Sequence, residues 1–126
     1  MASSKILLMD DESPILDIMK LFLTRGGYNV VCSSTGSQAL DIFSKNYDSG
    51  DKFDMAILDV SVPGDVGAKE IVGPMREIDS DIKVIITSGD SAQGAMDKPK
   101  EYGFCGALKK PFRSENLLNI VREALS

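Results

Sequence analysis

The sequence predicts an α/β fold in which a five-stranded parallel sheet carries helices on both faces. Short apolar runs alternate along the chain with longer segments whose apolar residues recur at helical spacing. The run Phe53–Asp59 is apolar on both of its faces, as a central parallel strand should be. The chain has 126 residues, 43% of them hydrophobic, which suits one core. We therefore expect a single domain over residues 1–126.

Each predicted strand is a short apolar run that ends in polar or turn-forming residues. The predicted strands are Lys5–Met9, Tyr28–Cys32, Phe53–Asp59, Lys83–Ser88 and Gly106–Leu108. Because helical segments separate them, right-handed crossovers would make the strands parallel.

Four of the intervening segments carry an apolar stripe at helical spacing. The first begins near Ser13 and Pro14, since proline suits the first turn of a helix, and it stops at Gly26. The other stripes centre on Ala39 to Phe43, Ile71 to Met75 and Leu117 to Val121. The segment 89–103 contains Gly94 and Pro99 and few large apolar residues, so we expect a short or frayed helix there.

Composition excludes several classes of function. The net charge is −5, which argues against nucleic-acid binding by this chain alone, because phosphate contacts need a basic patch. No apolar run approaches membrane-spanning length and the first residues show no signal-peptide pattern, so we expect no membrane contact and a cytoplasmic location. The chain has no histidine, the commonest general base. We predict Cys32 and Cys105 to be buried as small hydrophobic residues.

Polar side chains follow the carboxyl ends of four predicted strands, the edge where open α/β sheets bind ligands. They are Asp10, Asp11 and Glu12, then Asp59, then Ser88, and finally Lys109 and Lys110. Two carboxylates about 4 Å apart repel by roughly 4 kcal/mol at an effective dielectric near 20, so a cation between them is expected. Carboxylate oxygens with waters and a phosphate describe a Mg²⁺ site. Taken singly, the acids also suit a helix start or a turn; only their joint placement indicates a site.

Four motifs in order give the chain a family resemblance. They are "LLMDDE", "AILDVSVPG", "IITSG" and "LKKPF". Over its whole length the sequence resembles the receiver domain of two-component response regulators, of the chemotaxis-regulator type. A softer resemblance, in "PGDVGAKEIVGPMREID", is to receivers of hybrid histidine kinases. The resemblance implies a flavodoxin-like, doubly wound sheet with strand order 2-1-3-4-5.

The resemblance also implies residue roles. Asp59 matches the phosphoacceptor, and the metal ligands would be Asp10, Asp11, Asp59 and the backbone carbonyl of Ser61, with Mg²⁺ as the ion and Mn²⁺ as a substitute. Ser88 matches the switch hydroxyl and Lys110 its ion-pair partner, in preference to their neighbours Thr87 and Lys109, because Ser88-Gly89 and Lys110-Pro111 fit the family pattern. The bond before Pro111 is expected to be cis.

The resemblance implies a phosphoacceptor, not an enzyme with a separate substrate, although such a domain assists its own phosphorylation and dephosphorylation. A histidine kinase or histidine phosphotransfer protein would donate the phosphoryl group. A downstream protein would bind the helix 4, strand 5 and helix 5 face. Ala107 stands where many receivers carry an aromatic switch residue, so we expect coupling from Ser88 to run through the segment 89–103 instead.

Two other functions are open at this stage. One is a small aspartate-nucleophile phosphatase of the haloacid dehalogenase type, with Asp10 as nucleophile. That family has Asp-x-Asp where this chain has Asp10-x-Glu12. The other is a flavodoxin-like ligand binder without a signalling role, but the chain lacks a glycine-rich phosphate loop after the first strand.

Overall fold

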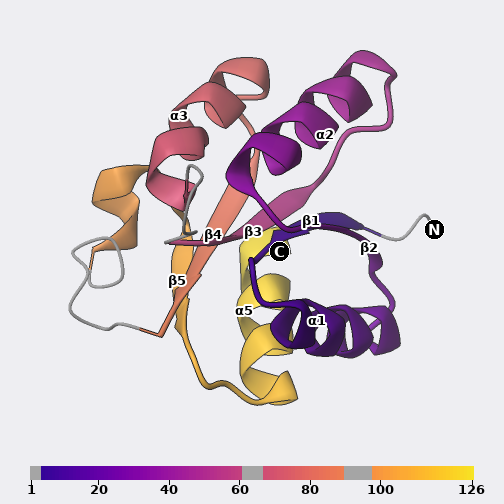
Figure 1. Ribbon diagram of the computed structural model, residues 1–126, viewed down its shortest axis with the longest axis vertical. Helices are drawn as coiled ribbons and strands as arrows, with labels where there is room; N and C mark the ends of the chain where they lie inside the picture. Colours follow the sequence, from indigo (N-terminus) through magenta and orange to yellow (C-terminus); the bar gives the residue numbers. More distant parts are fainter. Residues whose placement is uncertain (1–3, 61–66, 90–97) are drawn as a thin grey trace.

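The computed structural model describes residues 4–60, 67–89 and 98–126. A parallel sheet of five strands in the order β2-β1-β3-β4-β5 forms the centre of the molecule. Helices α2 and α3 cover one face of this sheet, and helices α1 and α5 cover the other (Figure 1). The fold class and the strand order predicted from the sequence are thereby confirmed.

The strands are β1 (Lys5–Met9), β2 (Asn29–Ser33), β3 (Met55–Asp59), β4 (Lys83–Ser88) and β5 (Gly106–Lys109). The helices are α1 (Ser13–Arg25), α2 (Gly36–Asp48), α3 (Ala68–Ile78), the 3₁₀ helix η1 (Pro99–Tyr102) and α5 (Ser114–Leu125). The predicted strands are thus correct to within one or two residues at each end.

Alternation along the strands divides the core into two halves. In β1, Leu7 and Met9 pack toward α2 and α3, while Ile6 and Leu8 pack toward α1 and α5. All five residues of β3 are buried, because both faces of this central strand are covered. Fully burying one of its apolar side chains contributes about 1.5–3 kcal/mol, so this strand stabilises the sheet strongly.

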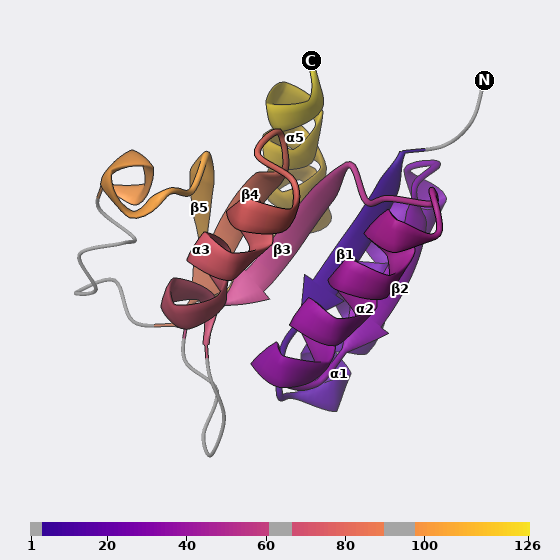
Figure 2. The same ribbon diagram turned by 90° about the horizontal axis from the view of Figure 1, so that it is seen from above.

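Local sequence explains how the helices begin. Thr35 precedes α2 and its hydroxyl oxygen accepts a hydrogen bond from the backbone N–H of Gln38, an N-cap. Pro14 lies in the first turn of α1, where its missing N–H costs nothing. Both helices begin shortly after a strand ends, so their first turns lie at the carboxyl edge of the sheet (Figure 2).

Two sequence predictions fall in the less regular part of the chain. Of the segment 89–103, the described end contains only one 3₁₀ turn, Pro99–Tyr102, and residues 90–97 lie outside the described part. The prediction that both cysteines are buried is wrong, since Cys105 is exposed and Cys32 is half-buried. Cys32 lies in the edge strand β2, and Cys105 directly precedes the edge strand β5. Neighbouring side chains in an extended chain point to opposite sides, so Cys105 is exposed where Phe104 is buried.

Candidate functional site

The strand order brings two acidic segments of the chain together. Strands β1 and β3 are hydrogen-bonded neighbours, with Met9 opposite Leu58. Asp10 directly follows β1, and Asp59 is the last residue of β3. Parallel neighbours end at the same edge, so their terminal carboxylates meet there.

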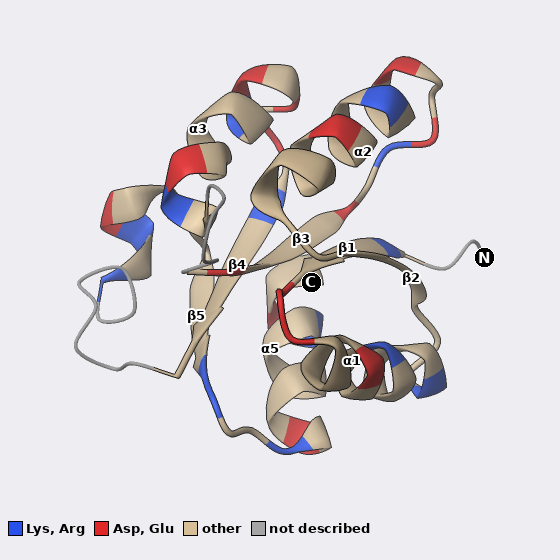
Figure 3. Cartoon of the chain, viewed as in Figure 1, with Lys and Arg blue, Asp and Glu red and all other residues tan. Residues whose placement is uncertain are grey.

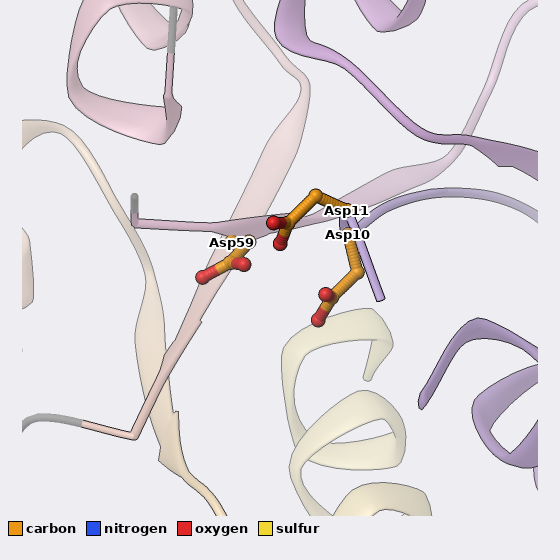
Figure 4. Close-up of side chains that lie close together, drawn as sticks. All are labelled: Asp10, Asp11 and Asp59. Atoms are coloured by element: carbon orange, nitrogen blue, oxygen red, sulfur yellow. The ribbon is translucent and has the colours of Figure 1, made fainter. Parts of the chain in front are cut away.

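Three carboxylates form a cluster at this edge of the sheet. Asp10, Asp11 and Asp59 each offer an oxygen, and these oxygens all lie within 4.8 Å of one another (Figure 4). Asp10 is 1% exposed and Asp59 is 6% exposed, whereas Asp11 is open to solvent. Two buried like charges so close need compensation by a cation or by hydrogen bonds. Oxygen ligands in this arrangement suit a hard divalent cation.

Lys110 supplies the positive charge at the cluster. It follows β5, and its Nζ lies 2.6 Å from Asp10 Oδ2, 3.7 Å from Asp59 Oδ2 and 3.8 Å from Glu12 Oε2. The acids at the start of α1 and the lysines after β5 can be followed in Figure 3. One ammonium thus lies within 4 Å of three carboxylates, and Asp11 adds a fourth negative charge to the cluster, so among the described residues the acids outnumber this cation.

The surroundings hold Lys110 in its charged form. Burial of the ammonium by itself lowers the pKa of Lys110. The hydrogen bond to Asp10, with the negative charges of Asp10, Asp59 and Glu12, outweighs this effect and raises the pKa above its ordinary value. Lys110 is therefore a cation at neutral pH, able to stabilise charge on a ligand of the cluster.

The backbone fixes the relative positions of the strand ends. The N–H of Lys110 donates to the carbonyl of Ser88 at 2.9 Å, and the N–H of Val60 donates to the carbonyl of Thr87 at 3.0 Å. Asp10 also accepts a hydrogen bond from the N–H of Glu12 through its Oδ1, at 3.0 Å. The cluster therefore lies on strand ends tied to one another, which favours a preorganised site.

The structure describes three of the remaining predicted site residues, Ser88, Gly89 and Pro111. Ser88 is buried at the end of β4, next to the buried Thr87, and a Cβ on Gly89 would meet only open space. The Lys110–Pro111 peptide bond is cis, as expected. Ser61 lies outside the described residues. The roles of all these residues stay predictions.

Ala107 lies in β5 opposite Ile86 and is half-buried against the core under α2 and α3. Its side chain is only a methyl group, and the expectation that coupling does not use an aromatic switch stays a prediction. The route of coupling itself stays a prediction.

Sequence reasoning missed two features of the site. Glu12 was counted among the acids at the edge, but its approach to Lys110 was not expected, because nothing local indicates a contact between residues so far apart in the chain. The second is a close backbone contact between Val60 and Gly67, on either side of the segment 61–66. Nothing in the local sequence indicated this contact.

Comparisons with known proteins agree with this geometry. The family model described as "Response regulator receiver domain" matches residues 6–122. Sporulation initiation phosphotransferase F of Bacillus subtilis is 31% identical over 125 residues, which cover 99% of this chain and 96% of that protein. Two-component response regulator ARR10 of Arabidopsis thaliana is 34% identical over 118 residues, covering 92% of this chain but only 20% of the relative.

A solved structure extends the likeness to three dimensions. The chemotaxis protein CheY4 of Vibrio cholerae has a TM-score of 0.84 and 27% identity, with 98% of this chain and 100% of that chain covered. The family match leaves no support for the phosphatase of the haloacid dehalogenase type. In the part of the chain that the structure describes, no helix is long and apolar enough to span a membrane. The chain belongs to the response regulator receiver domain family, the phosphoacceptor signalling domain of two-component systems.

Proposed function

We propose that Asp59 is the phosphoacceptor of this receiver domain and that a phosphohistidine of a partner protein is the donor. The observation that carries the proposal is the cluster of Asp10, Asp11 and Asp59 with Lys110 beside it. A carboxylate oxygen of Asp59 attacks phosphorus, the bond from phosphorus to the imidazole nitrogen breaks, and an acyl phosphate forms. The imidazole leaves as a neutral group when its other nitrogen carries a proton.

The fit of a divalent cation rests on the donor set. Asp10, Asp11 and Asp59 supply hard oxygen ligands, and their charge exceeds what Lys110 neutralises. Mg²⁺ is the ion we propose, with Mn²⁺ as a substitute, and when bound it neutralises charge on the phosphoryl group. The Ser61 carbonyl is a further proposed ligand.

Lys110 and Ser88 complete the proposed roles. Phosphoryl transfer needs mainly alignment and stabilisation of the charge on the equatorial oxygens. The ammonium of Lys110 is proposed to bind one of these oxygens, and its distance of 3.7 Å from Asp59 supports this role. Ser88, at the end of the adjacent strand β4, is proposed to bind another through its hydroxyl and so report phosphorylation to the rest of the domain.

The partner also needs a surface beside Asp59, because transfer requires direct contact. On α1, Ile18 and Leu21 are each 47% exposed, and an apolar pocket beside Lys110 is lined by Ile15, Ile18, Pro111 and Phe112. We propose that the phosphodonor, a histidine kinase or histidine phosphotransfer protein, docks here. Replacing Ile18→Lys should slow labelling by a phosphorylated kinase that labels the unmodified chain, while labelling by acetyl phosphate stays unchanged.

The assignment of Asp59 is tested by intact mass after incubation with acetyl phosphate, with and without Mg²⁺. The expected result is one added phosphoryl group that requires Mg²⁺ and is absent in Asp59→Ala. Asp54→Ala, at the opposite end of β3, is the matched control and should be labelled normally. Labelling that survives Asp59→Ala would overturn the assignment. We further propose that the domain has a signalling role and no separate substrate. Hydrolysis of the acyl phosphate returns Asp59 to its unphosphorylated state.

A further inference from the structure

Two backbone segments beside the site approach each other more closely than a side chain would allow. A Cβ built on Gly67 would lie 2.3 Å from the carbonyl oxygen of Val60 and 3.1 Å from its carbonyl carbon. The φ angle of Gly67 is −101°, which any residue can adopt. The need for glycine therefore comes from this contact and not from backbone conformation.

Both sides of the contact are anchored. Val60 directly follows Asp59 and is buried, and its N–H donates to the carbonyl of Thr87 in β4. Gly67 is also buried, and its carbonyl accepts hydrogen bonds from the first turn of α3, including that from Ile71 at 3.3 Å. Neither segment can retreat from an added methyl group without losing these bonds.

Glu70 holds Gly67 in place from within the same helix. One carboxylate oxygen of Glu70, Oε2, accepts a hydrogen bond from the N–H of Gly67 at 3.0 Å. This N–H belongs to the N-cap residue of α3, so its donor would otherwise have no partner inside the helix. Glu70 thereby fixes the start of α3 against the chain that leaves Asp59.

We propose that Gly67 and Glu70 are positioning residues for phosphoryl transfer to Asp59. They fix the peptide carbonyl of Val60, the residue that directly follows the nucleophile. This proposal rests on the proposed function of Asp59. Misplacing a reacting or ligating group by about 1 Å can cost roughly 100-fold in rate, so a shift of this peptide should be measurable.

Gly67→Ala should slow labelling by acetyl phosphate about 10-fold or more and raise the Mg²⁺ concentration needed for half-maximal labelling. Gly73→Ala is the matched control. A Cβ on Gly73 meets nothing within 4 Å, yet alanine before Pro74 also disturbs α3. It should therefore alter stability without changing the labelling rate. All rates are measured well below each melting temperature, so that loss of stability alone leaves them unmoved.

Glu70 provides a second test that does not depend on Gly67→Ala folding. Glu70→Ala removes the acceptor for the Gly67 N–H and should slow labelling, while Glu70→Gln keeps an acceptor oxygen and should restore most of the rate. The increase in melting temperature on adding Mg²⁺ alone should fall in Glu70→Ala and recover in Glu70→Gln.

The outcomes separate this proposal from the assignment of Asp59. If the unmodified chain is labelled at Asp59 and folded Gly67→Ala or Glu70→Ala is labelled at the same rate, positioning by these residues is overturned. If the unmodified chain is not labelled at Asp59 at all, the proposed function fails first.

Discussion

The two ends of the sheet both carry aspartates and lysines, but the contacts of these side chains differ. At the amino-terminal end, the carboxylate of Asp54 accepts a hydrogen bond from the N–H of Lys5 at 2.7 Å, and the Lys5 ammonium pairs with Asp51. Asp79 accepts a hydrogen bond from the N–H of Asp81. Each of these acids has its own donor, and each shapes a local turn or strand start.

At the carboxyl end, the acids face one another. Asp10, Asp11 and Asp59 lie together, the ammonium of Lys110 is within 4 Å of Asp10 and Asp59, and these two acids are buried. The number of acids therefore does not distinguish a binding site from a scaffold. At the binding site the carboxylates lie close together and the positive charge beside them does not neutralise all of them. Such buried negative charge is costly unless a bound ligand balances it.

The largest expected contrast between the two ends is in reactivity. Lys110→Met should lower the rate of labelling by acetyl phosphate about 100-fold, because it removes the cation that stabilises the transferred group. Lys83→Met, at the amino-terminal start of β4, should leave this rate unchanged. Time courses of intact mass at saturating Mg²⁺ give both rates. Equal rates for the two variants would contradict the role of Lys110.

The next contrast is in stabilisation by metal. At a Mg²⁺ concentration 100 times its Kd, binding to the folded state should stabilise the chain by about 2.7 kcal/mol. Asp11→Asn should remove most of this gain, because it takes away one of the three clustered carboxylates, whereas Asp54→Asn should keep it. Thermal unfolding with Mg²⁺ and with a chelator measures the difference. A gain that survives in Asp11→Asn would place the ion elsewhere.

A smaller change is expected in the free energy of unfolding of the metal-free protein. Asp11→Asn should stabilise the metal-free protein by about 1 kcal/mol, the order of the repulsion between two charges near 4 Å in water. Asp54→Asn should stabilise it by less or destabilise it, because Asp54 accepts a hydrogen bond and, among the described residues, is not one of the three carboxylates whose oxygens lie within 4.8 Å of one another. Urea unfolding in chelator gives both free energies. Destabilisation by Asp11→Asn would show that the cluster has no surplus of negative charge.

The smallest effect concerns a thiol near the amino-terminal end. Although Cys105 is exposed as a residue, partial removal of its thiol from water raises the pKa above its ordinary value, and Lys83 and Arg76 act in the opposite direction. Alkylation of Cys105 in a Cys32→Ser variant should therefore be slow at pH 7 and still increasing above pH 9.0, since the thiolate is the reactive form. A half-maximal rate below pH 9.0 would mean that the positive charges of Lys83 and Arg76 outweigh the effect of burial.

Much of the fold was predictable because its signals are local. Apolar runs such as Lys5–Met9 and Lys83–Ser88 are short, and the turn residues that bound them lie next to them in the chain. The position of Asp59 at a strand end follows in the same way from the apolar run Phe53–Asp59. The exposure of Cys105 was predicted wrongly, because residues beside edge strands have a neighbouring strand on one side only, and the sequence does not mark which strands are edges.

The sequence by itself determined the parallel α/β fold and the edge of the sheet at which acids, hydroxyls and lysines end. Periodicity and turn chemistry act over a few residues, so they can be read without knowing the fold. The tertiary structure alone decided that Lys110 reaches Asp10, 100 residues away in the chain, and that Val60 touches Gly67. These contacts depend on how separate strands and helices pack, and packing distances are not encoded in any local pattern.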